Sequence, residues 1–427
     1  MKRYDNYKSS GVEWIGDIPE AWNIKKGKYL FGFMNGYPFD SKKFSFNPNA
    51  KFQIIRIRDI NNHSSQTFWD GDCIQEALID NDDILIGMDG DFNISKWKGG
   101  KALLNQRVCK VFGKDSISNE YLIYLLPFSL KVINDLTYYT TVKHLSNDDL
   151  WCDAFPVPPL SEQTAIAKYL DEKTEQIDKL IAGKRRLIEL LKEERLGVIN
   201  QAVTRGINQN AKLKPSGIAW LGDIPEHWVV VSIGYRFEVQ LGKMLDEKRI
   251  TGKHLAPYLR NTDVQWQKIN TIDLPVMDFS EDDREKFSLK NGDLLVCEGG
   301  EVGRCAIWKE EISDCFYQKA LHRIRPVNKE KDSTEFLFYL MFVASERGLF
   351  TATGNSNIIQ HLPAEKLRKH QFPFPPIEEQ KQIVEFIETA TEKIDATIAK
   401  IEKEIGFMRE YRTALISEVV TGKIKVV

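Results

Sequence analysis

The side chains best suited to contacting bases or phosphates gather in short polar stretches, and these stretches occupy equivalent places in the two halves of the chain. Ordinary exposed loops are the alternative interpretation of each stretch. The candidate DNA contacts are Lys96, Lys98, Lys101, Tyr138, Tyr139, Thr141, Lys143 and His144 in the first half, and Lys243, Arg249, Lys253, His254, Arg304, Asn355, Asn357, Gln360 and His361 in the second.

Recognisable enzyme motifs are absent from the sequence. It contains no Gly-x-x-x-x-Gly-Lys-Ser/Thr phosphate loop, no His-Glu-x-x-His metal helix and no Gly-x-Ser-x-Gly nucleophile elbow. The glycine-rich residues 298–304 resemble a phosphate loop only loosely. The acidic pairs at 82–83 and 282–283 are more typical of solvated turns than of a metal site. No catalytic and no metal-binding residue is therefore predicted.

Length and composition indicate a multidomain soluble protein. The 427 residues exceed one average domain, and 42% hydrophobic with 28% charged residues is ordinary globular composition. The longest strongly apolar run, residues 336–344, is about half of what a membrane span needs. Six scattered cysteines fit free thiols in a reducing compartment, so we expect a cytoplasmic protein without membrane contact. The net charge of −2 neither indicates nor excludes nucleic-acid binding.

The elements that must position these residues occur twice. Residues 10–22 recur as residues 216–228 with nine of thirteen positions identical. Weaker echoes follow in the same order: 55–60 with 259–264, 83–86 with 293–296, 120–125 with 335–340, 144–145 with 361–362, and 155–163 with 372–380. Each half therefore predicts a Trp-flanked turn, a region of short strands such as 52–57 and 229–231, a proline-rich stop and a long helix.

The two long helices are predicted at 161–205 and 381–421. Ser161 is a candidate N-cap, Glu162 a favourable first-turn charge, and Gly206 a natural stop. Apolar residues recur in steps of four and three from Leu170 to Ala202, and the same register continues in the second helix after a shift of 217 residues. Both helices carry a threonine and an arginine on this seam, at Thr174 with Arg195 and again 217 residues later.

Helix length favours pairing of these helices with each other over packing on separate domains. About 45 residues at ~1.5 Å each make a rod of roughly 65–70 Å, which is longer than a domain of about 150 residues. If the pair is antiparallel, the two globular regions lie at opposite ends of the rod. We therefore predict an α+β protein with a pseudo-twofold internal repeat, in which a long antiparallel two-helix coiled coil holds two similar mixed α/β domains apart. The predicted segments are a first domain at 1–158, a helix at 159–206, a second domain at 207–375 and a helix at 376–427.

These features resemble the specificity subunit of type I restriction–modification systems. The resemblance covers essentially the whole chain: two Trp-Ile/Leu-Gly-Asp-Ile-Pro-Glu openings, two variable regions, and two Pro-Pro-x-x-Glu-Gln junctions, at 158–163 and 375–380. It implies that each variable region is a target recognition domain for one half of a bipartite double-stranded DNA sequence. It also implies that the helices set the spacing between the half-sites.

The same resemblance implies that catalysis belongs to other subunits. Two methyltransferase subunits would bind the helices, and restriction subunits would join the assembly. S-adenosylmethionine, ATP and magnesium would serve those partners, and adenine methylation after base flipping would be their chemistry. Two alternatives stay open: a self-contained DNA methyltransferase or nuclease, which would need a cofactor or metal motif, and a coiled-coil scaffold that does not bind DNA.

Overall fold

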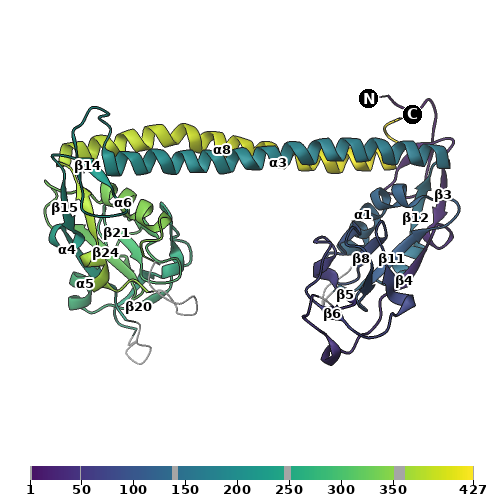
Figure 1. Cartoon of the computed structure of the whole chain (residues 1–427), viewed down its shortest axis with the longest axis horizontal. Coiled ribbons are helices and arrows are strands. Elements are labelled where there is room, and N and C mark those ends of the chain that lie inside the picture. Colours follow the sequence, from purple (N-terminus) through teal and green to yellow (C-terminus); the bar gives the residue numbers. More distant parts are fainter. Residues whose placement is uncertain (1, 49, 137–142, 245–251, 351–360, 427) are drawn as a thin grey trace. The chain divides into compact units, whose positions relative to one another are not determined.

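The computed structural model describes residues 2–48, 50–136, 143–244, 252–350 and 361–426 (Figure 1). Contacts between residues divide the chain into two compact units: unit 1 comprises residues 1–184 and 403–427, and unit 2 comprises 185–402. Each unit therefore contains one segment of each long helix, α3 (Leu160–Arg205) and α8 (Ile377–Val420). The segments predicted from the sequence divide the chain consecutively instead, so each long helix there is a separate segment and belongs to neither domain.

Unit 1 is built on two four-stranded sheets, two short strand pairs and two further helices, α1 (Asn119–Leu136) and α2 (Asn147–Cys152). The first sheet has the order β4 (Phe31–Asn35), β11 (Val108–Gly113), β8 (Ile84–Gly87), β9 (Ile94–Lys96). The second has the order β6 (Phe68–Trp69), β5 (Phe52–Ile55), β10 (Ala102–Leu104), β7 (Leu78–Ile79). The short pairs are β1 (Tyr7–Ser9) with β2 (Asp17–Pro19), and β3 (Asn23–Lys26) with β12 (Ala154–Val157).

Unit 2 repeats this framework with additions. Its main sheet has the order β16 (Phe237–Leu241), β24 (Leu321–Pro326), β21 (Leu294–Cys297), β22 (Cys305–Ile307). The smaller sheets are β20 (Val276–Asp278), β17 (Leu255–Leu259), β23 (Phe316–Tyr317), and the pairs β13 (Leu213–Pro215) with β14 (Asp223–Pro225), β15 (Val229–Ser232) with β25 (Gln371–Phe374), and β18 (Val264–Gln265) with β19 (Lys268–Ile269). Its short helices are α4 (Ile233–Arg236), α5 (Glu281–Phe287), α6 (Thr334–Glu346) and α7 (Ala364–Lys369).

Strand pairing confirms that the two units share one fold. The main sheet is antiparallel in both units and begins at equivalent partners, Phe31 opposite Gly113 and Phe237 opposite Pro326. Among the described strands of each unit there is also one parallel pair, β5 with β10 and β17 with β23. The predicted fold class, two similar mixed units with paired long helices, is thus confirmed.

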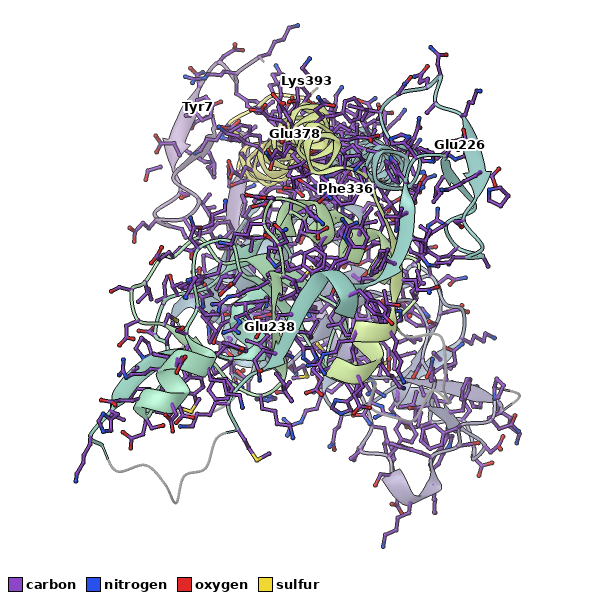
Figure 2. The ribbon with its side chains drawn as sticks, turned by 90° about the vertical axis from the view of Figure 1, so that its left-hand side faces the viewer. Tyr7, Glu226, Glu238, Phe336, Glu378 and Lys393 are labelled. Carbon is purple, nitrogen blue, oxygen red and sulfur yellow. The ribbon has the colours of Figure 1, made fainter. Side chains whose placement is uncertain are left out.

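The core of unit 2 joins its sheet to its helical segments. Phe336 of α6 is fully buried in one cluster with Trp228, with Ile199 of α3, and with Ile383 and Ile387 of α8. Figure 2 shows Phe336 beneath α8, the helix that carries the labelled Glu378 and Lys393. We call the part of each unit outside α3 and α8 its head. Because one cluster contains residues of sheet, short helix and long helices, the head of unit 2 and its helical segments form a single hydrophobic core.

The long helices pack against each other along the seam predicted from the sequence. None of the twenty seam positions is exposed in either helix. In unit 1, Arg412 Nε lies 3.3 Å from Asp178 Oδ1, and in unit 2, Arg195 Nε lies 2.9 Å from Asp395 Oδ1. Both the arginines and the aspartates are 217 residues apart, so the same ion pair forms twice with the roles of the helices exchanged. A slip of one helix by a heptad would break both pairs, and they therefore fix the register.

The prediction that Ser161 caps the first helix is wrong. Helix α3 begins at Leu160, and the backbone N–H groups of Glu162 and Gln163 both donate to the Pro159 carbonyl (2.9 Å each). Ser161 therefore lies inside the first turn. The Glu162 carboxylate instead accepts a hydrogen bond from the indole N–H of Trp22 (3.0 Å).

The same junction occurs in unit 2. The indole N–H of Trp228 donates to Glu379 (3.1 Å). The residue after each glutamate is a fully buried glutamine. Gln380 donates to the carbonyls of Lys331 (3.0 Å) and Pro375 (2.9 Å) and accepts from the Ser333 N–H (3.0 Å). In unit 1 the corresponding glutamine makes the matching three bonds. The Glu-Gln pairs of the two proline-rich junctions thus join each helix to its head.

Replacing Gln380 with alanine should destabilise unit 2. The substitution leaves one backbone N–H and two carbonyls without their buried partner, at roughly 1–3 kcal/mol for each unsatisfied group. We expect a loss of at least about 2 kcal/mol, seen by calorimetry as a transition lowered by about 4–8 °C. Gln382→Ala, at an exposed position of the same helix, is the matched control and should stay within about 0.5 kcal/mol of the parent. Equal transitions for both variants would contradict the role given to Gln380.

Candidate nucleic-acid interface

Three segments of unit 1 meet at one end of its main sheet, and we call them the first loop cluster. They are the β8–β9 loop (residues 88–93), the β10–β11 turn (residues 105–107) and His144. The backbone N–H of Met88 donates to the carbonyl of Arg107 (2.9 Å), and the N–H of Leu145 donates to the carbonyl of Met88 (2.7 Å). His144 forms an isolated β-bridge with Asp89.

Unit 2 contains the same arrangement, the second loop cluster, made of residues 298–304, 318–320 and His361. The N–H of Glu298 donates to the carbonyl of Ala320 (2.9 Å), the N–H of Leu362 donates to the carbonyl of Glu298 (2.8 Å), and His361 bridges Gly299. The glycine-rich segment noticed in the sequence is therefore a hairpin loop with a counterpart in unit 1 at 88–93. The sequence echo of the two histidines follows from this shared geometry.

Glycines fix the backbone beside both clusters. A Cβ atom added to Gly36 would lie 2.1 Å from the Asn105 carbonyl oxygen, and one added to Gly242 would lie 2.2 Å from that of Gln318. Any larger residue would push the turn of residues 105–107 or 318–320 away from its sheet. The frame of both clusters is thus held in the same way by backbone contacts.

The side chains on this common frame differ. Asp89 in the first cluster corresponds to Gly299 in the second, and Arg107 corresponds to Ala320, since each pair makes equivalent backbone contacts. Sequence reasoning overlooked Asp89 and Arg107, although the alignment of the turn that precedes β11 with the turn that precedes β24 would have drawn attention to the arginine. The two clusters thus have the same backbone arrangement but different polar side chains, as two surfaces that recognise different base sequences would need.

The lysines around Trp97 are not part of the first cluster. Lys96 pairs with Ile84 at the far end of the β8–β9 hairpin and contacts Asp82 (3.1 Å), while Lys98 and Lys101 are exposed in the turn that follows. Trp97 is fully buried and donates to the Gly100 carbonyl (2.6 Å). A role of this basic turn in phosphate contact remains a prediction, at a place distinct from His144.

The Lys243 side chain has partners within unit 2. Its ammonium group donates to the Asp278 carbonyl (2.5 Å) and to Asp283 Oδ2 (2.7 Å), and it lies over the ring of Phe279. Burial opposes ionisation of Asp283, but hydrogen bonds from Lys243 and Ser280 outweigh it and lower the pKa of the carboxyl group. Lys243 therefore ties strand β16 to the segment around α5.

Three further predicted residues of unit 2 are described. Lys253 and His254 lie on exposed backbone before β17, where the His254 N–H donates to Asp278 (2.8 Å). Arg304 supports its loop from within: the guanidinium donates to the Asn261 carbonyl (3.0 Å) and to Glu301 (3.2 Å), and 13% of the side chain is exposed.

Seven predicted contacts lie outside the described residues. They precede His144 or His361 in the chain, or belong to the basic stretch after Lys243, and they are Tyr138, Tyr139, Thr141, Arg249, Asn355, Asn357 and Gln360. Lys143, by contrast, is described: its ammonium group donates to Asn134 Oδ1 at the end of α1 (2.5 Å). Contacts of all these residues with DNA stay predictions.

A buried histidine forms a hydrogen bond to the backbone beside the second loop cluster. His322 of β24 donates from Nε2 to the Leu362 carbonyl (2.8 Å), directly after His361. Burial lowers the pKa of the His322 imidazole, and the Leu362 carbonyl only partly offsets this. The imidazole is therefore neutral near pH 7 and contributes position rather than charge.

The duplicated heads, junctions and paired helices agree with a comparison of the chain with known families. Residues 19–190 and 225–406 each match the model of the type I restriction modification DNA specificity domain, and together they cover most of the chain. The chain belongs to this specificity family. The two matches fall on equivalent parts of the repeat, as the duplicated junctions require.

Full-length relatives support the assignment. The chain is 27% identical to the type I restriction enzyme EcoBI specificity subunit of Escherichia coli, over 97% of this chain and 88% of that protein. It is 26% identical to the MjaVIII specificity subunit of Methanocaldococcus jannaschii, over 96% and 94%. Among solved structures, the fold superposes on a chain from a structural study of complex assembly and conformational transition of the type I R-M system. The TM-score is 0.71 at 15% identity, over 95% of this chain and 99% of that one. The HsdS subunit of Thermoanaerobacter tengcongensis gives 0.50 at 15% identity, over 95% and 98%.

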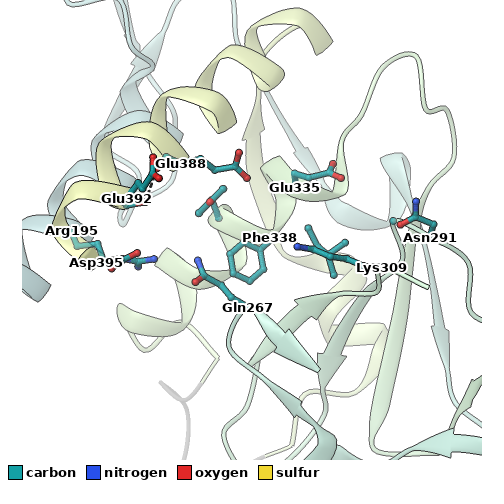
Figure 3. Close-up of a pocket in the computed structure, with 13 residues that line it drawn as sticks. Arg195, Gln267, Asn291, Lys309, Glu335, Phe338, Glu388, Glu392 and Asp395 are labelled. Atoms are coloured by element: carbon teal, nitrogen blue, oxygen red, sulfur yellow. Dashed lines mark hydrogen bonds and ion pairs between the residues drawn. The ribbon is translucent and has the colours of Figure 1, made fainter. Parts of the chain in front are cut away.

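In this member of the specificity family, unit 2 also contains a cleft of about 740 Å³ between its head and its helical segments (Figure 3). Glu388, Glu392 and Asp395 of α8 and Glu335 of α6 line it. Burial, together with the nearby Glu388 carboxylate, raises the pKa of Tyr339 in this cleft to about 12, so its phenol stays protonated. These four carboxylates outnumber the two cationic side chains of the lining, Arg195 and Lys309, so the cleft is acidic and does not attract phosphate.

The described residues contain no group of three or more His, Cys, Asp or Glu side chains arranged to hold a metal ion. No helix in the described part of the chain is both long and apolar enough to cross a membrane.

Proposed function

We propose that this chain is the DNA-recognition subunit of a type I restriction–modification assembly, in which each unit reads one half of a bipartite target. The observation that carries the proposal is the pair of loop clusters. Their backbone bonds are equivalent, whereas their side chains differ at Asp89 against Gly299 and at Arg107 against Ala320. The fold thus supplies two copies of one frame, each able to present its own set of donors and acceptors to base edges.

The paired helices supply the binding surface for methyltransferase subunits. Interfaces that bind proteins are enriched in large apolar and aromatic residues. Such side chains are exposed on α3 and α8 although the seam itself is covered. Away from the first turn of α3 they are Leu180, Leu187 and Leu190 of α3, and Phe386, Phe407 and Tyr411 of α8, each at least 45% exposed.

The chain itself is non-catalytic, and its partners supply the chemistry. S-adenosylmethionine binds the methyltransferase subunits, ATP and magnesium serve the restriction subunits, and the assembly works in the cytoplasm. The relatives named above are specificity subunits rather than methyltransferases or nucleases. The sequence contains no recognisable motif for these cofactors.

The purified chain should therefore show no methyl transfer, ATP hydrolysis or DNA cleavage. Methyl transfer to a random duplex library should appear only after co-expression with the methyltransferase subunit. A mobility shift of the same library, with and without that subunit, tests DNA binding itself. Robust methylation by the chain alone would show it to be a self-contained methyltransferase, and the absence of a shift in both samples would indicate a scaffold.

A further inference from the structure

Three polar side chains converge on the exposed face of the first loop cluster, each from a different segment. Asp89 Oδ1 lies 2.7 Å from His144 Nδ1, and Asp89 Oδ2 lies 3.4 Å from Arg107 Nε. Arg107 Nη1 lies 3.4 Å from the same imidazole nitrogen. About half of the Arg107 side chain (53%) and of the His144 side chain (48%) is exposed, against 22% for Asp89.

The position of the hydrogen between His144 and Asp89 follows from the chemistry of the carboxylate. An ionised carboxylate only accepts hydrogen bonds, so Nδ1 of His144 carries a hydrogen and donates it to Asp89. The same nitrogen then cannot accept from Arg107, and the 3.4 Å approach of Nη1 is a contact rather than a hydrogen bond. Asp89 therefore forms an ion pair with Arg107 on its Nε side (3.4 Å), and no carboxylate or carbonyl oxygen of the described residues accepts a hydrogen bond from Nη1 or Nη2.

The backbone that carries these side chains is anchored on several sides. The Arg107 carbonyl accepts from the Met88 N–H (2.9 Å), and the Gly90 N–H donates to the Lys143 carbonyl (3.1 Å). The Asn134 amide donates to the Gly90 carbonyl (2.7 Å). Arg107 is thus fixed at its main chain and near its guanidinium, which reduces the conformational entropy lost when the Nη edge binds a ligand.

The Nη edge selects among the four bases. It offers two nearly parallel N–H donors and no acceptor. In the major groove guanine presents two adjacent acceptors, N7 and O6, whereas adenine presents an acceptor beside a donor, cytosine presents a donor, and thymine presents one acceptor beside a methyl group. Only guanine satisfies both N–H groups of the edge.

We propose that Arg107 reads a guanine in the half-site recognised by unit 1, and that Asp89 is the positioning residue that orients it. This inference rests on the proposed function and adds to it a base, a residue and a half-site. Unit 2 has Ala320 and Gly299 at the equivalent positions, so its half-site is not read by an arginine there.

The test uses the full chain co-expressed with its methyltransferase subunit, and methylome sequencing as the readout. Arg107→Ala should make one guanine of a single half-site degenerate, with discrimination at that base pair falling about 5- to 140-fold, the range of one bidentate contact. Lysine keeps the charge and can donate to guanine, but only from one flexible ammonium group, so Arg107→Lys should restore discrimination at that base pair only in part. Asp89→Asn should relax the same base pair and no other.

Lys28→Ala is the charge-matched control. Lys28 is exposed at the opposite end of the β4–β11 pair of the same head, and its loss should leave the motif unchanged. Uniformly weaker methylation in Arg107→Ala that Arg107→Lys restores would show a phosphate contact and overturn guanine reading. An unchanged motif in both Arg107 variants, or relaxation in the half-site of unit 2, would overturn it as well. If the parent chain directs no bipartite motif at all, the proposed function itself fails, which is a separate result.

Discussion

Exchanging residues 30–155 for the equivalent stretch of another specificity subunit should replace one half of the methylated motif and leave the other half and the gap unchanged. The exchanged stretch contains the whole main sheet of unit 1 and its loop cluster. The contact of Trp22 with Glu162 stays in the host chain. The Ser116 carbonyl and the Ser118 N–H that bind Gln163 are exchanged, so the donor stretch must offer the same two backbone groups to keep the junction with the long helices. We expect complete replacement of one half-site, because every candidate base contact of unit 1 is exchanged.

The reciprocal exchange is the matched control. Residues 236–372 are the counterpart of 30–155 in unit 2, as shown by the equivalent starts of β4 and β16 and the equivalent strands β12 and β25. Their exchange should change only the other half-site. Leu30 and Phe155, at the ends of the first stretch, are fully buried, so the donor should carry apolar residues of similar size there. A change in both half-sites, or in neither, after either exchange would contradict two separate readers.

Lengthening both long helices by a heptad should widen the gap between the half-sites and leave the half-sites unchanged. One heptad is inserted after Leu191 and another after Met408, which are equivalent positions on the seam. The insertions keep the hydrophobic seam in phase and leave the Arg195–Asp395 and Asp178–Arg412 ion pairs intact. If the paired helices set the gap, seven residues at ~1.5 Å each add about 10 Å, roughly three base pairs at ~3.4 Å per pair.

The added base pairs also rotate the far half-site about the duplex axis. Three extra pairs turn the far half-site by about 100° on a duplex of roughly 10.5 pairs per turn. Supercoil rotation need not match that angle, so we expect an active variant with a gap longer by one to four pairs. Methylome sequencing gives the gap directly, and an active variant with the original gap would show that the helices do not set it.

An insertion after Leu191 alone is the control for helix pairing. It lengthens α3 but not α8, so the two ion pairs can no longer form in one register. We expect loss of methylation at every site. Full activity of this single insertion would mean that the register of the two helices is not needed for assembly.

The sequence by itself determined the repeat, the two long helices and their seam. These are local or periodic patterns: residues 10–22 recur as 216–228, and the 3–4 spacing of apolar residues is readable without knowledge of any distant partner. The predicted strands at 52–57 and 229–231 appear as β5 and β15 for the same reason. The family resemblance depended on these motifs, and the match to the specificity-domain model confirms it.

Only the tertiary structure decided which polar side chains meet. Ser161 has the residue type of an N-cap, yet the helix begins before it, and Glu162 binds Trp22, which lies 140 residues away. Arg107 and Asp89 meet because of the pairing of β8 with β11 and the bridge to His144. Lys96 lies away from them because a three-residue strand carries it to the other end of the hairpin. Strand register sets such long-range contacts, and register depends on packing across the whole sheet rather than on the spacing of residues along the chain.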